Sequence, residues 1–81
     1  MEVLYGFKAF FRIVLRPEPE GGYTVFVPSL PGCITYGDTV EDAIKMAKEA
    51  VHAYLESMKK HKEEIVDDSR TLESMLEFEY A

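Results

Sequence analysis

Apolar and polar residues alternate along the first part of the chain, a pattern that predicts β-strands. In residues 8–16 every odd-numbered position is apolar, whereas the even-numbered positions include three basic side chains. Residues 17–22 hold two prolines and two glycines, which favour a loop. A second alternating stretch follows at residues 23–27. The two stretches therefore predict a β-hairpin with a long loop.

The two faces of this hairpin differ in what they are expected to contact. Tyr23 and Val27 share a face with the apolar odd-numbered positions of the first strand, and this face is expected to line the core. Three large apolar side chains fall on the opposite face: Phe10, Val14 and Phe26. We expect this second face to be covered by another element or to form the interface of an oligomer.

A long amphipathic helix is the strongest pattern in the chain. Residues 33–36 predict a short third strand, and Gly37 permits a turn after it. Thr39 is a favourable N-cap, and residues 40–58 carry apolar side chains at helical spacing. The sequence therefore predicts a helix whose apolar stripe packs on one face of the sheet.

The C-terminal residues alternate again. Leu76, Phe78 and Tyr80 are separated by Glu77 and Glu79, which predicts a final strand with one apolar and one acidic face. The apolar residues at 72, 75 and 76 also fit one helical turn, so the start of this strand stays open. The expected fold is a single α+β domain over 1–81, with a mostly antiparallel sheet in the order β-β-β-α-β and one long helix on one face.

Composition narrows the possible partners. The 81 residues carry a net charge of −6, and residues 62–81, with 2 basic and 7 acidic side chains, account for −5 of it. Direct nucleic-acid binding is therefore not expected, because such binding depends on basic side chains that neutralise phosphates. A basic protein is the expected partner. The acids that we expect to contribute electrostatically are Glu63, Glu64, Asp67, Asp68, Glu77 and Glu79.

The expected cellular compartment and the type of source organism are inferred from segments and residue types that the chain lacks. No apolar run is long enough to span a membrane, and Glu2 stands where a signal peptide carries a basic residue. A single cysteine, Cys33, excludes an internal disulfide and fits a reducing cytoplasm. The chain has no Asn and no Gln, a depletion that is typical of thermophiles.

Few residues suggest catalysis. Cys33 has no evident base to hold a thiolate, and His52 and His61 fall on opposite sides of the predicted helix. Asp38, Glu41 and Asp42 form an acidic group that could hold Mg²⁺ in a nuclease. The more ordinary interpretation is that the acids complement the N-terminus of the helix. We therefore expect no enzymatic activity, no metal and no cofactor.

The stretch from residue 23 to 43 resembles the HicB-like antitoxin family. The pattern of that family is an aromatic-rich strand, Pro-Asp-Leu-Pro-Gly-Cys, a short strand, Gly-Asp-Thr, and Glu-Glu-Ala at the start of a long helix. Ser29 stands where the family usually has Asp, and Asp42 where it has the second Glu. The positions that match are Pro28, Leu30, Pro31, Gly32, Cys33, Gly37, Asp38, Thr39, Glu41 and Ala43.

The resemblance implies a partially degraded ribonuclease-H-like domain without nuclease residues. It also implies a partner, a small basic HicA-type toxin that cleaves mRNA and is neutralised when the antitoxin binds it. Many members add a C-terminal DNA-binding segment, which we do not expect in a chain that ends at Ala81 with an acidic tail. The alternative hypothesis is a structural domain that has lost its toxin and persists as a homodimer or a higher homo-oligomer.

Overall fold

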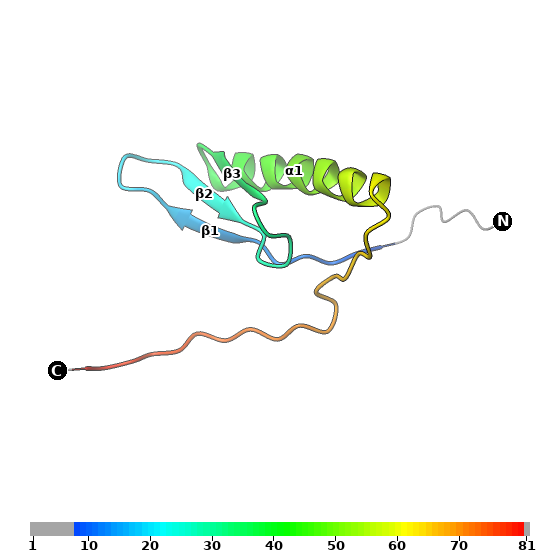
Figure 1. The fold of residues 1–81 in the computed structure, drawn as a ribbon. Helices are drawn as coiled ribbons and strands as arrows, with labels where there is room; N and C mark the ends of the chain where they lie inside the picture. Colours follow the sequence, from blue (N-terminus) through cyan, green and yellow to red (C-terminus); the bar gives the residue numbers. More distant parts are fainter. Residues whose placement is uncertain (1–7, 81) are drawn as a thin grey trace.

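The computed structural model describes residues 8–80 and has an α+β architecture. Three strands, β1 (Val14–Pro17), β2 (Tyr23–Phe26) and β3 (Ile34–Gly37), form an antiparallel sheet in the order β1-β2-β3. The helix α1 (Val40–Lys60) follows and lies along one face of the sheet (Figure 1). The α+β prediction is thus confirmed. Among these residues no helix is long and apolar enough to cross a membrane.

β1 is shorter than the strand predicted at residues 8–16. Its first residue, Val14, pairs with Phe26, the last residue of β2. The chain turns away directly after β2, so the residues before Val14 have no strand beside them on that side. Local alternation predicts an extended backbone at residues 8–13, but a β-strand also needs a paired neighbour.

Two consecutive turns, residues 27–33, connect β2 to β3 and are here called the double turn. The amide of Leu30 donates to the carbonyl of Val27, and the amide of Cys33 donates to the carbonyl of Leu30, both at 2.9 Å. Gly32 has a φ of 82° and follows a proline, as in a type II turn. Cys33 therefore still belongs to the turn, and β3 begins one residue later than the sequence predicts.

Small residues bring α1 close to the sheet. Thr39 caps the helix as predicted, since its hydroxyl accepts a 3.0 Å hydrogen bond from the amide of Asp42. A Cβ at Gly37 would overlap the backbone of Ala43, so glycine is required where β3 meets the helix. Ala43 and Ala47 are buried against Val25.

The core is only partly enclosed. One cluster contains Val25, Ala43 and Ala47, and the second contains the buried residues Val27, Leu30 and Cys33 of the double turn. The apolar side chains on the core face before and in β1 remain half-buried: Phe11, Ile13 and Leu15. Similarly half-buried residues lie on the second half of α1: Ala50, Val51, Tyr54, Leu55 and Met58.

The predicted final strand is wrong for the residues that the structure describes. Residues 71–80, here called the tail, have no strand assignment and run as an extended segment clear of the sheet (Figure 1). Leu76, Phe78 and Tyr80 are 85%, 75% and 82% exposed. The alternation of apolar and acidic residues predicts a strand, but within residues 8–80 no strand lies beside the tail to pair with it. The observed order is therefore β-β-β-α over residues 8–80.

Candidate interaction surface

The sheet face opposite α1, here called the outer face, carries Val14, Arg16, Phe26, Ile34 and Tyr36. The strand register places Val14, Phe26 and Ile34 in one row across all three strands. Val14 is 44% exposed and Ile34 is 56% exposed. Directly opposed residues of an antiparallel pair lie on the same face, so this row forms a continuous apolar strip.

Polar groups border the apolar row. The guanidinium of Arg16 lies 4.7 Å from the centre of the Phe26 ring, a cation–π contact that leaves Phe26 only half-exposed. The hydroxyl of Tyr36 donates a 2.9 Å hydrogen bond to the carbonyl of Gly21. Partial desolvation, together with the nearby charge of Asp38, raises the pKa of Tyr36. An apolar centre with a polar border is typical of protein-binding surfaces.

The sequence identified part of this surface. Phe10 and Val14, two of the three predicted interface residues, are exposed, and the third, Phe26, lies beneath Arg16. Ile34 and Tyr36 were missed. The sequence holds a signal for them, because cysteine is among the residue types most often buried, and alternation from Cys33 places both residues on the opposite face.

A pair of acids after α1, here called the anchor, holds the chain segment that precedes β1. Asp68 is buried, and its Oδ1 accepts a 2.6 Å hydrogen bond from the hydroxyl of Ser29. Its Oδ2 accepts a 2.9 Å bond from the amide of Arg12, and its own amide donates to the carbonyl of Phe10. The other member, Asp67, accepts a 2.9 Å bond from the amide of Phe10. The anchor thus occupies the position beside residues 10–12 that β2 leaves when it turns away.

Both anchor carboxylates are stabilised in the charged form. Hydrogen bonds from Ser29 and from the amide of Arg12 lower the pKa of Asp68. The amide of Phe10 and the groups of Ser69 lower the pKa of Asp67. These two acids therefore have partners within the chain, which was not evident from the sequence.

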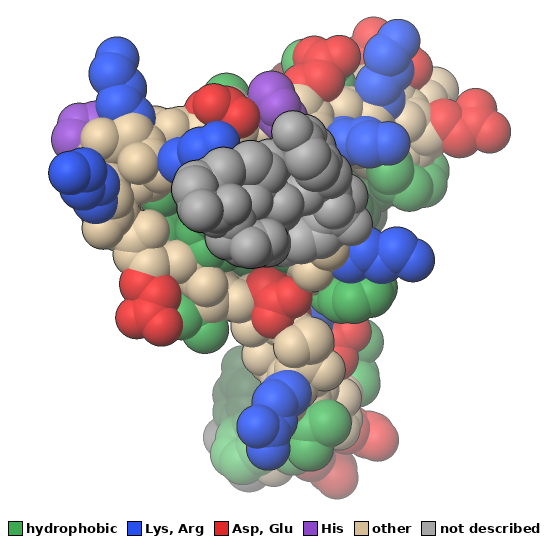
Figure 2. Space-filling view, turned by 90° about the vertical axis from the view of Figure 1, so that its right-hand side faces the viewer, with side chains coloured by type: hydrophobic (Ala, Val, Ile, Leu, Met, Phe, Trp, Pro, Cys, Tyr) green, Lys and Arg blue, Asp and Glu red, His purple; other side chains and the backbone are tan. Residues whose placement is uncertain are grey.

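The other predicted acids face solvent. Glu63 and Glu64 are exposed on the segment after α1, and Glu77 and Glu79 are exposed on the tail. Figure 2 shows this C-terminal part projecting from the body of the protein, with hydrophobic, acidic and basic side chains on its surface. The negative charge available to a partner is thus concentrated on the segment after α1 and on the tail.

Residues that could support catalysis are not brought together. Among residues 8–80 no group of three or more His, Cys, Asp or Glu side chains is placed to hold a metal ion. Cys33 is buried, and burial raises the pKa of its thiol. His52 lies 3.8 Å from Glu56 on α1, an ordinary helix-surface pair.

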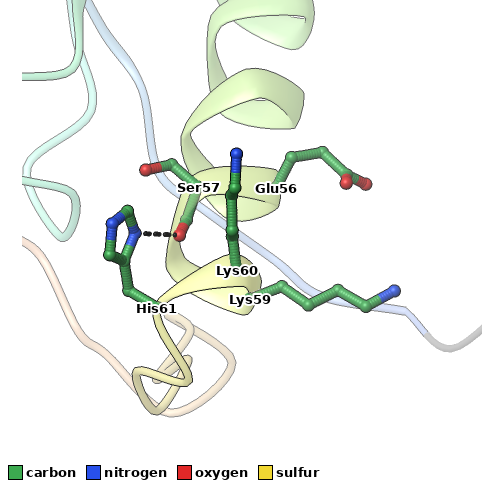
Figure 3. A pocket seen from close by; sticks show the side chains of 5 residues that line it. All are labelled: Glu56, Ser57, Lys59, Lys60 and His61. Carbon is green, nitrogen blue, oxygen red and sulfur yellow. Dashed lines mark hydrogen bonds between the residues drawn. The ribbon is translucent and has the colours of Figure 1, made fainter.

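The end of α1 carries a shallow open depression. It is lined by Glu56, Ser57, Lys59, Lys60 and His61. Figure 3 shows the Nδ1 of His61 facing the carbonyl of Ser57, a distance of 2.8 Å; Lys59 extends away from the helix, whereas Lys60 runs back along it between Ser57 and Glu56. Basic residues at this position complement the C-terminal dipole of the helix, which explains them without a ligand.

Comparison with known proteins gives the family. The profile of the HicB-like antitoxin of bacterial toxin–antitoxin systems matches residues 11–81. A UPF0150 protein of Thermoplasma acidophilum is 44% identical over 59 residues, which cover 73% of this chain and 86% of the relative. A UPF0150 protein of Synechocystis is 44% identical over 48 residues, covering 59% and 61%. The chain belongs to the HicB-like antitoxin family.

Proteins named as antitoxins also match this HicB-like chain, over a shorter stretch. Antitoxin HicB of Escherichia coli is 42% identical over 41 residues, which cover 51% of this chain and 30% of the antitoxin. Antitoxin HicB 1 of Photorhabdus laumondii is 44% identical over 41 residues, covering 51% and 26%. The match thus spans less than a third of either antitoxin.

The structure shows where the matched positions of the HicB-like pattern lie. Pro28 and Pro31 enter the two turns of the double turn, and the hydroxyl of Tyr54 on α1 donates a 2.8 Å bond to the carbonyl of Pro31. Gly37 and Ala43 form the close contact between β3 and α1. The pattern therefore marks positions that build the fold. The remaining matched positions are Leu30 and Cys33 in the core, Gly32 in the second turn, Thr39 at the cap, and the exposed acids Asp38 and Glu41.

Proposed function

We propose that this HicB-like chain is a non-enzymatic antitoxin that binds and neutralises a small basic HicA-type mRNA-cleaving toxin in the cytoplasm. Family membership supports a toxin as the partner. The observation that carries the proposal is the net charge of −5 on residues 62–81, whose glutamates face solvent. A protein that binds RNA presents basic side chains, so an acidic surface is complementary to it.

Neutralisation would result from occupying the RNA-binding face of the toxin. The exposed glutamates after α1 and on the tail take the place of RNA phosphates. The apolar row of the outer face offers desolvated contact area, which gives affinity that charge alone does not supply. The anchor acids already have partners within the chain, so the proposed electrostatic contribution comes mainly from Glu63, Glu64, Glu77 and Glu79.

Charge variants test this proposal. We expect the double variant Glu63→Gln/Glu64→Gln to associate with the toxin more slowly, and to show a weaker dependence of the association rate on salt. The variant Glu77→Gln/Glu79→Gln is expected to behave in the same way. Rates measured by stopped flow between about 50 and 300 mM salt would show this effect.

A matched control removes the same charge from elsewhere. Glu20 lies in the β1–β2 loop and Glu49 on α1, and both are exposed. Glu20→Gln/Glu49→Gln should therefore leave the association rate close to that of the wild type. If all three double variants slowed association equally, the rate would depend only on the net charge of the chain. If none of them changed the association rate, the proposal would be contradicted.

A second candidate function is a structural homo-oligomer without a toxin. The observation that favours it is the apolar row on the outer face. Phe10, four residues before β1, is also exposed. Light scattering of the chain alone, with Val14→Thr and Ile34→Thr as variants, would test it. This candidate predicts an oligomer that the two substitutions dissociate, together with a gene neighbourhood that encodes no small basic protein.

A further inference from the structure

The outer edge of β1 is unpaired within residues 8–80. The amide of Glu18 donates to the carbonyl of Gly22, and the register places Arg16 opposite Thr24. Hydrogen-bonded pairs alternate along an antiparallel ladder, so the even-numbered residues of this strand bond to β2. The odd-numbered residues, such as Leu15, therefore direct their backbone groups away from β2, toward the open edge. An edge of this kind is a ready template for another strand.

The core is open beside the same edge. α1 lies mainly over β3 and β2 rather than over β1. Ile13 and Leu15 consequently remain half-buried although they pack against the core clusters. A strand added outside β1 would cover these side chains with its own apolar face.

The tail has the pattern that such a strand requires. Leu76, Phe78 and Tyr80 are all at least 75% exposed. The rings of Phe78 and Tyr80 lie 6.1 Å apart, which is consistent with one shared face of an extended segment. Glu77 and Glu79 alternate with them and fall on the other face. A segment this apolar is unfavourable in water unless it has a surface to cover.

Both faces of the tail match the β1 edge. With the apolar side chains toward α1, the two glutamates lie on the outer side of the sheet, where β1 presents the exposed Arg16, whose Nε lies 3.7 Å from Glu18. Arg12, before β1, already donates a 2.9 Å hydrogen bond to Glu73 of its own chain and therefore adds no free charge. Opposite charges on neighbouring strands stabilise the pairing. The β3 edge offers no such match, because its outer side carries Ile34 and Tyr36 and then the acidic Asp38.

The path of the chain favours the edge of another molecule. The anchor holds Asp68 against Arg12 and Phe10 through even-numbered residues, which is the β2 side of this segment. The start of the tail is held by Arg12, whose guanidinium donates a 2.9 Å hydrogen bond to Glu73, and the residues beyond it extend clear of their own sheet (Figure 1). We propose that the tail of one copy pairs as a strand with the β1 edge of a second copy, and that two copies exchange tails about a two-fold axis.

This exchange goes beyond the proposed antitoxin function and needs no toxin. An 81-residue chain buries only about 60% of its unfolded surface, so enclosing the open core adds stability where it is scarce. The contact is reciprocal, as a two-fold interface requires. It also fixes the tail glutamates at the border of the outer face.

Charge reversal tests the exchange on the full chain. The tail variant Glu77→Lys/Glu79→Lys places lysines opposite Arg16 in a pair of identical copies, and Arg16→Glu places an acid opposite the tail glutamates. Each variant alone should dimerise roughly tenfold or more weakly than the wild type, because like charges meet at both exchanged tails. In an equimolar mixture both contacts join opposite charges, so the dimer should recover as a heterodimer. Light scattering and native mass spectrometry measure both results.

The opposite results would overturn the proposal. A wild-type chain that is still monomeric at about 100 μM would contradict the exchange, because the dissociation constant of the dimer would then lie in the millimolar range of weak association. Variants that dimerise as well as the wild type would show that the tail makes no contact between copies. Monomers that do not recover on mixing would show that the tail glutamates do not meet Arg16 of a second copy, which overturns the exchange. If the variants pass the mixing test but the wild-type dimer does not bind the toxin, the antitoxin proposal alone would be contradicted.

Discussion

The hydroxyl of Ser29 donates a 2.6 Å hydrogen bond to the Oδ1 of Asp68, which joins the double turn to the segment that follows α1. The Oδ2 of the same carboxylate accepts from the amide of Arg12, just before β1. One buried side chain therefore connects three segments that are distant in sequence. It closes the side of the fold that β2 leaves open when it turns away.

Removing this connection should destabilise the protein. We expect Ser29→Ala to lower the free energy of unfolding by about 1–2 kcal/mol, because a buried acceptor loses its donor. Asp68→Ala should have a larger effect, since it leaves the groups of both Ser29 and Arg12 without their acceptor. Urea unfolding followed by circular dichroism measures both. Ser74→Ala, on the exposed tail, is the control and should change stability little.

The anchor also predicts a loss of stability in acid. The pKa values of Asp67 and Asp68 are lowered from 3.8 in the folded chain, so the folded state binds these protons less tightly than the unfolded state. Their contribution is complete above the ordinary carboxyl value and is lost as the pH falls below it through the lowered values. The melting temperature should therefore decrease below about pH 4, and less steeply in Asp68→Asn. An Asp68→Asn profile parallel to that of the wild type would contradict this role.

Two glycines should respond differently to substitution by alanine. Gly37→Ala should lower the free energy of unfolding by at least about 2 kcal/mol, because the new Cβ overlaps the backbone of Ala43. At Gly32 the space is open but φ is 82°, so Gly32→Ala should lower it by about 1–2 kcal/mol through backbone strain alone. Urea unfolding distinguishes the two, and an equal or reversed order would mean that β3 and α1 can separate easily.

The N-cap of α1 offers a prediction with a built-in rescue. Thr39→Ala should lower the free energy of unfolding by about 1 kcal/mol, since the amide of Asp42 loses its acceptor. Thr39→Ser retains a hydroxyl and should restore most of this loss. If the serine variant were as unstable as the alanine variant, the methyl group of Thr39 rather than the cap would be responsible.

Local sequence patterns predicted the elements that form through contacts between residues close in the sequence. The helix begins at Val40 after the predicted cap, and the hairpin, the turns and the small residues facing the sheet follow from short-range rules. The predicted apolar stripe is less buried at its start, where Val40 and Ile44 are 46% and 48% exposed. Periodicity identifies the face of a helix but not how far a small sheet extends beneath it.

Features that depend on distant residues could not be predicted. The sequence Asp67-Asp68-Ser69 reads as a loop, and nothing near it indicates that its carboxylates bind the amides of residues 10 and 12. The tail reads as a strand because its side chains alternate, although pairing depends on an edge that is absent beside it. The candidate surface was predicted in part, from Phe10, Val14 and Phe26, and was extended by the register that brings Ile34 into the same row.

Inhibition of RNA cleavage tests the antitoxin proposal most directly. The full chain would be titrated into the basic protein encoded beside its gene while cleavage of a labelled mRNA is followed. We predict that cleavage stops at a fixed stoichiometry, that the two proteins co-purify, and that the chain alone cleaves no RNA. Cleavage that continues at a large excess of correctly folded chain, with an active neighbouring protein, would contradict the proposal.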